Sequence, residues 1–473
     1  MKTDQTDLGR RDFFKRLSAG LSVTGLALAG CAPSKTADVA SPGDRGEVPT
    51  DKMTYRTTPS TGDKVSLLGY GCMRWPLMTD PDSEEGKEIV DQEAVNKLVD
   101  YAIEHGVNYF DTAPPYVRGL SEEATGIALS RHPRDSYFVA TKMSNQNLAR
   151  GGMKGKELYD ASVKMYHNSM DKLRTDYKDY YLLHNCGGES GIPFLEQRFI
   201  DSGLLDFLLK EREEGRIRNL GFSYHGDVKV FDYLLAMHDK VKWDFVQIQL
   251  NYVDYRHASG MNFNAEYLYD ELAKRDIPAV IMEPLLGGRL ASLSDHLNAR
   301  LKERSPEESV AAWAFRFSGT FPKVLTVLSG MTYREHLEDN IRTYSPLRAL
   351  TDEEMDMLEE TAVEIINYPS VPCTTCEYCM PCPYGINIPA IFAHYNKCVN
   401  EGNVTSSKMD GKYAQARRAF LVGYDRSVPK LRQASHCIGC DQCKPHCPQT
   451  IDIPAQLHRI DRYVESLKQG TLA

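Results

Sequence analysis

The chain has 473 residues, a mass of 53.3 kDa and a formal net charge of −9. Its hydrophobic fraction of 42% and charged fraction of 26% are typical of a packed soluble protein, and its acidic balance argues against a nucleic-acid partner. Twelve cysteines are too few for a disulfide-stapled scaffold, and nine of them fall between Cys373 and Cys447. Composition therefore predicts a large globular body followed by a small cysteine-rich module.

The first thirty residues have the order of parts found in an export signal. Five basic residues against three acidic ones give residues 1–30 a charge of +2, so the remaining chain carries −11. The motif RRDFFK at 10–15 matches the twin-arginine pattern, and an apolar stretch follows it at 17–29. That stretch is shorter than the ~20 residues needed to span a bilayer. We predict export by the twin-arginine route; the alternative is an amphipathic tail with a chance arginine pair.

The apolar stretch ends in LAGC, and its Cys31 resembles the lipidated cysteine of the bacterial lipobox. The resemblance implies a membrane-anchored lipoprotein with the lipid on Cys31 as its one membrane contact, whereas a chain without that lipid would be periplasmic. Residues 31–52 are rich in Pro, Ser and Gly, which predicts a flexible tether. The predicted order is a signal at 1–30, a tether at 31–52, a barrel at 53–350 and the cysteine-rich module at 351–473.

Short apolar runs alternate with helical periodicities along the body of the chain, which is typical of repeated strand–helix units. Eight runs are predicted to be strands, beginning at Ser66, Asn108, Tyr137, Asp179, Asn219, Phe245, Pro278 and Val324. Helices are predicted between them, including 156–174, 200–214, 227–239, 265–275 and 333–344. The fold class is therefore α/β, an eight-stranded (β/α)8 TIM barrel. A doubly wound sheet is the competitor, but no G-x-G-x-x-G follows the first strand.

Four polar residues follow three consecutive predicted strands, at the end of a barrel where active sites form. Asp111 and Tyr116 follow the second strand, Lys142 ends the third and His184 ends the fourth. Alone, each could be structural. Together they favour proton transfer, because an ammonium lowers the pKa of a tyrosine from about 10 and a carboxylate keeps that ammonium charged. A neighbouring histidine can orient a carbonyl oxygen.

These residues, with the motifs DTAPPY, ATK, LRTDYKDYYLLH, GFS, VQIQ, PLLGG and HLEDN, resemble the aldo/keto reductase family over roughly residues 64–344. The resemblance implies a small carbonyl or alcohol substrate. It implies Tyr116 as the general acid/base, Lys142 and Asp111 as the residues that tune it, and His184 as the residue that orients the carbonyl. It also implies NADP(H) or NAD(H) as cofactor. The implied nucleotide contacts are Ser223, Gln247, Met282, Pro284, Leu285 and Asn340.

Several positions depart from the family's nucleotide pattern. Met282 stands where an aromatic residue stacks on the nicotinamide, and Tyr224 replaces the asparagine that follows the serine of GFS. Gly330 and His336 stand at positions that are basic in NADP-dependent members, which leaves Arg334 as the nearby cation. The proton-transfer residues thus match the family, while the expectation of tight NADPH binding is weaker.

Eight cysteines form two similar motifs near the C-terminus. The motif at 437–447 has the C-x2-C-x2-C-x3-C-P spacing of bacterial ferredoxins, and the one at 373–382 is one residue shorter. Four thiolates also suit zinc, which is the alternative. In two-cluster ferredoxins the fourth cysteine of each motif binds the other cluster. We therefore predict a helical ferredoxin-like domain with two [4Fe–4S] clusters, one held by Cys373, Cys376, Cys379 and Cys447, the other by Cys437, Cys440, Cys443 and Cys382.

Three cysteines, Cys72, Cys186 and Cys398, have no motif and are predicted to be buried thiols, although Cys186 could line a pocket beside His184. The whole chain is interpreted as an exported oxidoreductase that interconverts a carbonyl and an alcohol. Its clusters relay electrons to a redox partner protein or carrier. Because each cluster passes one electron, a nicotinamide or flavin must mediate. The alternatives are an ordinary NADPH-dependent reductase with structural clusters and a non-catalytic electron-transfer subunit.

Overall fold

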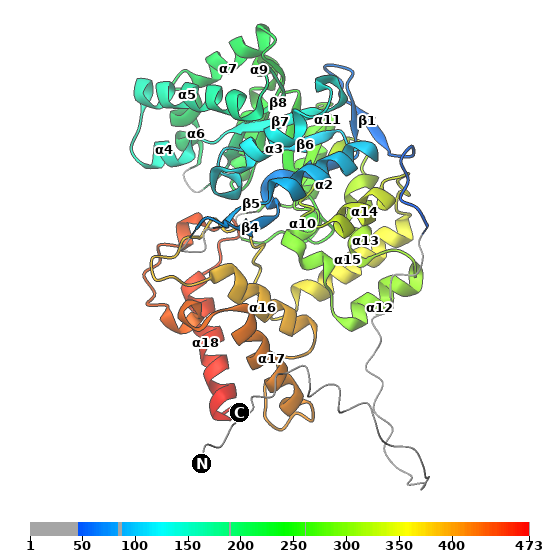
Figure 1. The fold of residues 1–473 in the computed structure, drawn as a ribbon, viewed down its shortest axis with the longest axis vertical. Coiled ribbons are helices and arrows are strands. Elements are labelled where there is room, and N and C mark those ends of the chain that lie inside the picture. The colour runs from blue at the N-terminus through cyan, green and yellow to red at the C-terminus, as the bar shows by residue number, and fades with distance from the viewer. Residues whose placement is uncertain (1–45, 84–87, 189–190, 261, 473) are drawn as a thin grey trace, which may run out of the picture. The chain divides into compact units, whose positions relative to one another are not determined.

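Eight parallel strands close into a barrel, as the alternating pattern predicts (Figure 1). The last strand pairs with the first, Val327 opposite Leu68, so the sheet has no free edge. All eight predicted strands are confirmed, and the doubly wound sheet is excluded. In chain order they are β3 (Leu68–Gly71), β6 (Tyr109–Asp111), β7 (Phe138–Met143), β8 (Lys178–Cys186), β9 (Ile217–Tyr224), β10 (Phe245–Gln249), β11 (Ala279–Met282) and β12 (Val324–Ser329).

The structure is a computed structural model that describes residues 46–83, 88–188, 191–260 and 262–472. The predicted export signal, Cys31 and most of the predicted tether lie outside these residues. The described chain from Glu47 onward belongs to one compact unit. Within the described ranges, no helix combines the length and the apolar character that crossing a bilayer requires.

The helices predicted between the strands are present, with bounds a few residues from those expected. The first of them, α2, begins where the Asp91 carboxylate accepts a hydrogen bond from the Ala94 amide, and it turns Val95, Leu98 and Val99 into the core. The helices around the barrel are α2 (Gln92–Glu104), α3 (Ser121–Leu129), α4 (Gln146–Arg150), α5 (Gly155–Leu173), α6 (Gly191–Phe199), α7 (Leu204–Glu213), α8 (Val228–Ala236), α9 (His238–Val241), α10 (Asp254–His257), α11 (Ala265–Lys274), α12 (Asp295–Arg304), α13 (Val310–Thr320) and α14 (Arg334–Thr343).

Two short hairpins were not predicted, since three-residue strands show little periodicity. One pairs β1 (Tyr55–Thr57) with β2 (Lys64–Ser66), and the other pairs β4 (Leu77–Thr79) with β5 (Glu88–Val90). The first is fastened by Arg56, whose guanidinium donates to the backbone carbonyls of Gly319, Phe321, Pro322 and Val324. This hairpin therefore closes the end of the barrel where the strands begin.

A helix outside the eight units, α15 (Asp352–Ile366), packs on the barrel. Its Leu358, Ala362 and Ile365 belong to the barrel's core cluster, which continues past residue 350. Its Glu354 forms an ion pair of 2.7 Å with Arg316 of α13, and both side chains are at most 2% exposed. A buried, charge-assisted hydrogen bond of this kind positions the helix that leads into the C-terminal module.

The C-terminal module is helical and has its own core (Figure 1). It consists of α16 (Ile388–Asn400), α17 (Tyr413–Ser427) and α18 (Ile453–Gln469). Its helices pack around Phe392, Phe420 and Ile460, all at 0% exposure. Two of the three helices, α16 and α17, lie in the chain between the two cysteine motifs.

One buried lysine makes the barrel's stability depend on pH. Lys178, at the start of β8, is 0% exposed, and among the described residues its Nζ has no hydrogen-bond partner. The Nζ lies 3.4 Å from the centroid of the Tyr166 ring. Burial lowers the pKa of Lys178 to about 7, although Glu122 and Glu211 oppose this shift.

Replacing Lys178 with methionine should therefore stabilise the protein near pH 7. The unfolded amine titrates near 10.4, so between pH 7 and 10 the unfolded chain binds more protons and the free energy of unfolding rises with pH. Lys178→Met should raise the free energy of unfolding by ~3 kcal/mol at pH 7 and make that free energy depend less on pH between 7 and 10. Thermal unfolding at several pH values measures both, with the exposed Lys164→Met as control. Equal pH slopes in wild type and Lys178→Met would contradict this account.

Candidate active site

The structure brings the four predicted catalytic residues together at the end of the barrel where the strands finish. Lys142 donates from Nζ to Asp111 Oδ1 at 2.5 Å and to the Thr112 carbonyl at 2.8 Å. Its Nζ lies 4.7 Å from the centroid of the Tyr116 ring. The Tyr116 and His184 rings meet edge to face with centroids 6.0 Å apart. All four side chains are at most 9% exposed.

A strained turn directs Tyr116 back over the strand ends. Val117 and Arg118, the two residues after it, have left-handed φ angles of 48° and 53°. Ser121, just beyond this turn, anchors it to the barrel. Its hydroxyl hydrogen-bonds to Thr112 Oγ1 and donates to the Cys72 carbonyl. The tyrosine is therefore held against the barrel by contacts on both sides of the turn.

Burial, rather than the neighbouring ammonium, dominates the titration of Tyr116. Burial raises the pKa of Tyr116 well above its usual value, and the nearby carboxylates of Asp111 and Glu283 raise it further. The prediction that the Lys142 ammonium lowers the pKa of Tyr116 is therefore wrong for the protein by itself. The phenol keeps its proton throughout the neutral range, which is the form that a general acid requires.

His184 is held in its neutral form. Burial lowers its pKa well below the usual value, and the cations Lys142 and Arg198 act in the same direction. Its Nδ1 shares a hydrogen bond of 2.5 Å with Ser144 Oγ. When the serine donates to Nδ1, the proton of the ring is on Nε2, where it can be donated to a carbonyl oxygen.

The residues at the predicted nicotinamide end fit a carboxamide. Gln247 is 2% exposed, and within the described chain its Oε1 is buried without a hydrogen-bond partner. Its Nε2 donates to Met282 Sδ at 3.6 Å. Ser223, opposite Gln247 in the β9–β10 pair, accepts a hydrogen bond from the Asn185 amide at 2.9 Å. An orphaned amide oxygen of this kind is matched by the N–H of a carboxamide.

The residues at the predicted phosphate end are engaged within the protein. Asn340 is 4% exposed and donates to Ser329 Oγ at 3.0 Å. Arg334 forms an ion pair of 2.8 Å with Glu338, and its guanidinium lies 3.8 Å from the centroid of the Tyr101 ring. Both side chains therefore already have partners within the protein, although the Arg334 side chain remains 61% exposed.

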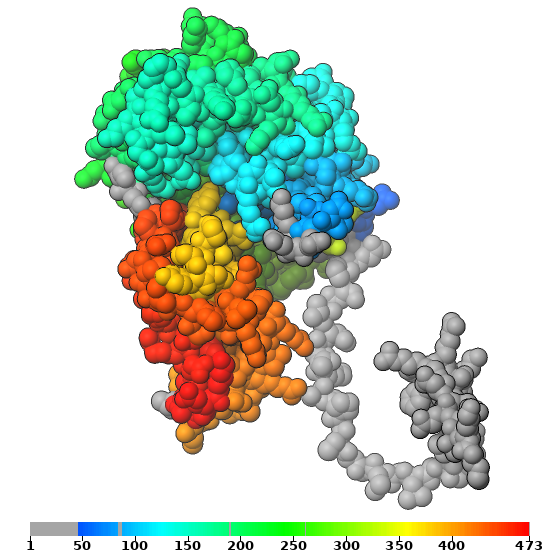
Figure 2. Space-filling model, turned by 60° about the vertical axis from the view of Figure 1, so that its left-hand side comes forward, coloured from blue at the N-terminus to red at the C-terminus, as the bar shows by residue number. Residues whose placement is uncertain are grey.

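The C-terminal module also covers the loop that carries Pro284 and Leu285. A Cβ added at Gly287 of this loop would lie 2.3 Å from Thr374 Cα, so the two backbones are in direct contact. The aliphatic stem of Arg74 packs on Gly330, and its guanidinium donates to the Thr374 carbonyl at 3.2 Å. Figure 2 shows the gold segment around residues 370–390 lying directly against the barrel. The nicotinamide end of the site thus fits the predicted cofactor, whereas the loop of Pro284 and Leu285 is packed against the module.

The eight motif cysteines are grouped in space as the ferredoxin spacing predicts. Cys373, Cys376, Cys379 and Cys447 line one hollow, and Cys447 is an electrostatic neighbour of the other three. The Thr375 amide donates to Cys373 Sγ at 3.4 Å, a contact that suits a thiolate ligand. These four donors fit a cluster.

The second group is Cys437, Cys440, Cys443 and Cys382. Cys382 is an electrostatic neighbour of both Cys437 and Cys443, so the fourth cysteine of each motif lies with the other motif. Cys440 is exposed, whereas Cys447 of the first group is buried. The second group is therefore the one that solvent and a partner can approach.

Sequence reasoning missed two residues between the first cysteine group and the catalytic tyrosine. Tyr378, between Cys376 and Cys379, is an electrostatic neighbour of Tyr116, and it carries no sequence signal beyond its place between two ligands. Glu283 has a left-handed φ of 53°, and among the described residues its buried Oε2 is unpartnered. Burial raises the pKa of Glu283 to about 8. Its position directly after a strand was the one available signal.

The three cysteines outside the motifs are buried, as predicted. Cys72 and Cys186 are 0% exposed and Cys398 is 2% exposed. Cys186 donates from Sγ to the Leu183 carbonyl. These thiols are part of the packed cores.

Comparisons with known proteins agree with this architecture. The model of the aldo/keto reductase family matches residues 68–363, and that of a 4Fe-4S dicluster domain matches residues 372–451, which sets the zinc alternative aside. The chain is similar to L-galactose dehydrogenase of Arabidopsis thaliana, with 26% identity over 332 residues, 66% of this chain and 94% of that protein. It is also similar to the uncharacterized oxidoreductase YqkF of Bacillus subtilis, with 27% identity over 326 residues, 65% of this chain and 96% of that protein.

Among solved structures, an aldo-keto reductase from Klebsiella pneumoniae in complex with NADPH is 21% identical, with a TM-score of 0.49. The match covers 66% of this chain and 96% of that one. The family match spans more than half of the chain and coincides with the closed barrel. This chain therefore belongs to the aldo/keto reductase family and is an oxidoreductase with a C-terminal 4Fe-4S dicluster domain.

Proposed function

We propose that this protein interconverts a carbonyl and an alcohol at Tyr116 and exchanges the electrons with an external redox partner through its two clusters. One observation carries the proposal. Tyr378, which lies between the cluster ligands Cys376 and Cys379, is an electrostatic neighbour of Tyr116 and Asp111. The loop that would hold the first cluster therefore faces the site of proton transfer.

The proton chemistry follows from the chain's own residues. Tyr116 holds its proton because it is buried, and it donates that proton to the oxygen of a bound carbonyl. As the phenolate forms, the Lys142 ammonium, 4.7 Å from the ring, stabilises the developing negative charge. Asp111 keeps this ammonium in place, and neutral His184 orients the carbonyl oxygen. Alcohol oxidation uses the same groups in reverse.

The electrons require a mediator between the clusters and the substrate. Reduction of a carbonyl consumes two electrons and two protons, whereas each cluster passes one electron at a time. A nicotinamide or flavin bound beside Gln247 would supply the two-electron chemistry, and the unpartnered Gln247 Oε1 supports a carboxamide there. External electrons would enter at the group that contains the exposed Cys440.

An ordinary NADPH-dependent reductase with structural clusters is the second candidate, and the orphaned Gln247 oxygen favours it equally. The contact of Thr374 with Gly287 and the engagement of Asn340 with Ser329 weigh against NADPH that exchanges freely with solvent, since groups along the predicted nucleotide site are already in contact within the protein. A non-catalytic electron-transfer subunit is disfavoured by the assembled group of Asp111, Tyr116, Lys142 and His184.

Tyr116→Phe tests the catalytic proposal. With reduced methyl viologen as donor and a small aldehyde as substrate, kcat should fall by at least about 100-fold, because the acid is gone while the fold is kept. The paramagnetic resonance spectrum of the reduced clusters should not change. Tyr333→Phe, at a tyrosine that is 62% exposed, serves as the matched control. A kcat in Tyr116→Phe equal to that of wild type would contradict the proposed mechanism.

The mediator is identified in the same anaerobic preparation by mass spectrometry of released small molecules. A bound nicotinamide or flavin is expected. Rapid oxidation of free NADPH with clusters that never change redox state would instead support the ordinary reductase. A preparation with neither nicotinamide nor flavin would support the non-catalytic subunit.

The cluster assignment predicts which cysteine variants behave alike. Cys447→Ser and Cys376→Ser should lose the same cluster, and Cys382→Ser and Cys437→Ser should lose the other, each lowering the iron content from about eight to about four atoms per chain. Paramagnetic resonance of the reduced variants distinguishes the two remaining signals. Cys398→Ser should keep both clusters. A spectrum of Cys447→Ser that matched Cys437→Ser would show that the ligands are not exchanged between the motifs.

We also propose that the protein is exported with its clusters in place, since the twin-arginine motif precedes the apolar stretch in the sequence. Replacing Arg10 and Arg11 by lysine should leave the chain in the cytoplasmic fraction, whereas Arg16→Lys should not. Cys31→Ser should release an exported chain from the membrane fraction if Cys31 carries the lipid. Export of the paired lysine variant at the wild-type level would refute this route.

A further inference from the structure

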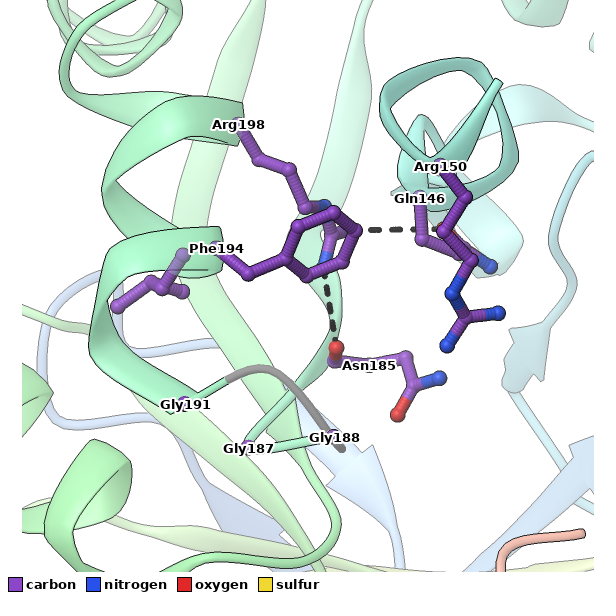
Figure 3. A pocket seen from close by; sticks show the side chains of 9 residues that line it. Gln146, Arg150, Asn185, Gly187, Gly188, Gly191, Phe194 and Arg198 are labelled. Atoms are coloured by element: carbon purple, nitrogen blue, oxygen red, sulfur yellow. Dashed lines mark hydrogen bonds between the residues drawn. The ribbon is translucent and has the colours of Figure 1, made fainter. Parts of the chain in front are cut away.

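A second polar cavity lies beside the catalytic histidine and has no role in the chemistry above. It opens between α4, α6 and the end of β8 (Figure 3). We call it the arginine pocket, and the side chains that define it are Gln146, Arg150, Asn185, Phe194 and Arg198. Asn185 directly follows His184, so the pocket adjoins the proposed site of carbonyl chemistry.

Arg198 brings a buried positive charge to this pocket. It is 1% exposed, and its guanidinium donates to the carbonyls of His184 at 2.6 Å and Asn185 at 3.0 Å. Its remaining partners are the side-chain oxygens of Asn145 and Gln146. All of these acceptors are neutral, and throughout the described chain no carboxylate pairs with Arg198. A buried charge without a counter-charge is costly, which favours an anion from outside.

Arg150 adds a second cation to the same space. The Arg150 and Arg198 guanidinium carbons lie 6.0 Å and 5.7 Å from the centroid of the Phe194 ring. Figure 3 shows the Arg150 guanidinium and the Asn185 side chain directed toward the same opening. Arg150 also forms no ion pair with any described residue. Burial lowers the pKa of Arg198 to about 10, and repulsion from Arg150 acts in the same direction, so the two charges affect each other.

The chemistry of the lining selects a carboxylate. A guanidinium presents two parallel N–H groups that match the two oxygens of a carboxylate, and Arg150 has these donors available. The amides of Asn185 and Gln146 supply further polar groups, while the Phe194 ring offers an apolar wall. The chain as a whole is acidic, so this concentration of positive charge is local.

We propose that the arginine pocket binds the carboxylate of the substrate, so that the protein acts on acids that carry a carbonyl or hydroxyl group. The carboxylate would lie against Arg150 while the reacting oxygen lies between Tyr116 and His184. This inference rests on the proposed function and adds the substrate class to it. Arg198 serves as a positioning residue, because it holds the backbone carbonyls of His184 and Asn185.

Binding can be tested without turnover. Calorimetric titration of the anaerobic holoprotein with benzoate should give an affinity that falls roughly 10-fold in Arg150→Gln and further in Arg150→Glu. Benzamide, the neutral analogue, should bind wild type no more tightly than it binds Arg150→Gln. Arg418→Gln, at an exposed arginine of α17, is the matched control and should bind benzoate like wild type.

The same variants test whether the pocket selects substrates. With reduced methyl viologen as donor, the ratio of kcat/KM for 4-carboxybenzaldehyde to that for methyl 4-formylbenzoate should fall roughly 10-fold in Arg150→Gln. The ratio in Arg418→Gln should equal that of wild type. If neither aldehyde is reduced by any variant, the proposed function fails, while the benzoate titration still decides whether the pocket exists.

Two results would overturn the inference. The first is an affinity for benzoate that is the same in wild type, Arg150→Gln and Arg150→Glu. The second is inorganic phosphate that binds as tightly as benzoate and competes with it, because a general anion site does not define a carboxylate-bearing substrate. Arg198 is left intact in every arm, since its loss would also release the His184 loop.

Discussion

The backbone contact between Thr374 and Gly287 is a close point of packing between the two halves of this protein. At this point the backbone of the cysteine-rich module lies against the loop after β11, and Arg74 fastens it from the loop after β3. The contact has two effects. It packs the module on the loop that carries Pro284 and Leu285, and the module places Tyr378 close enough to Tyr116 for the two side chains to interact electrostatically. The same packing therefore bears on both of the proposed routes for electrons, the nucleotide and the first cluster.

The catalytic centre depends on buried charges that satisfy one another. Lys142 sits between the Asp111 carboxylate and the Thr112 carbonyl, so its charge is held without solvent. Tyr116 and His184, which lack such partners, respond to burial by remaining neutral. One charged pair and two neutral groups form an arrangement that can move a proton to an oxygen without first having to remove water.

The sequence allowed most of the fold to be predicted, because the barrel's strands are continuous apolar runs and its helices show clear periodicity. The two hairpins were missed, since strands of three residues carry almost no pattern. The tetrad could be predicted because strand ends meet at one end of a barrel. The pKa of Tyr116 could not, because burial depends on what later packs over the tyrosine. Tyr378 and Glu283 were missed for the same reason, as their roles arise from the docking of distant segments.

Gly287 illustrates how the module constrains the barrel. Its φ is +68°, and no side chain fits between it and Thr374. In a barrel without the module, the left-handed φ would still disfavour a side chain at 287, but the contact with Thr374 would be absent. Here a substitution at 287 has to be matched by a change near 374, so the two domains cannot diverge independently. The packing of the barrel against the iron–sulfur module therefore constrains which residues can stand on both sides of the contact.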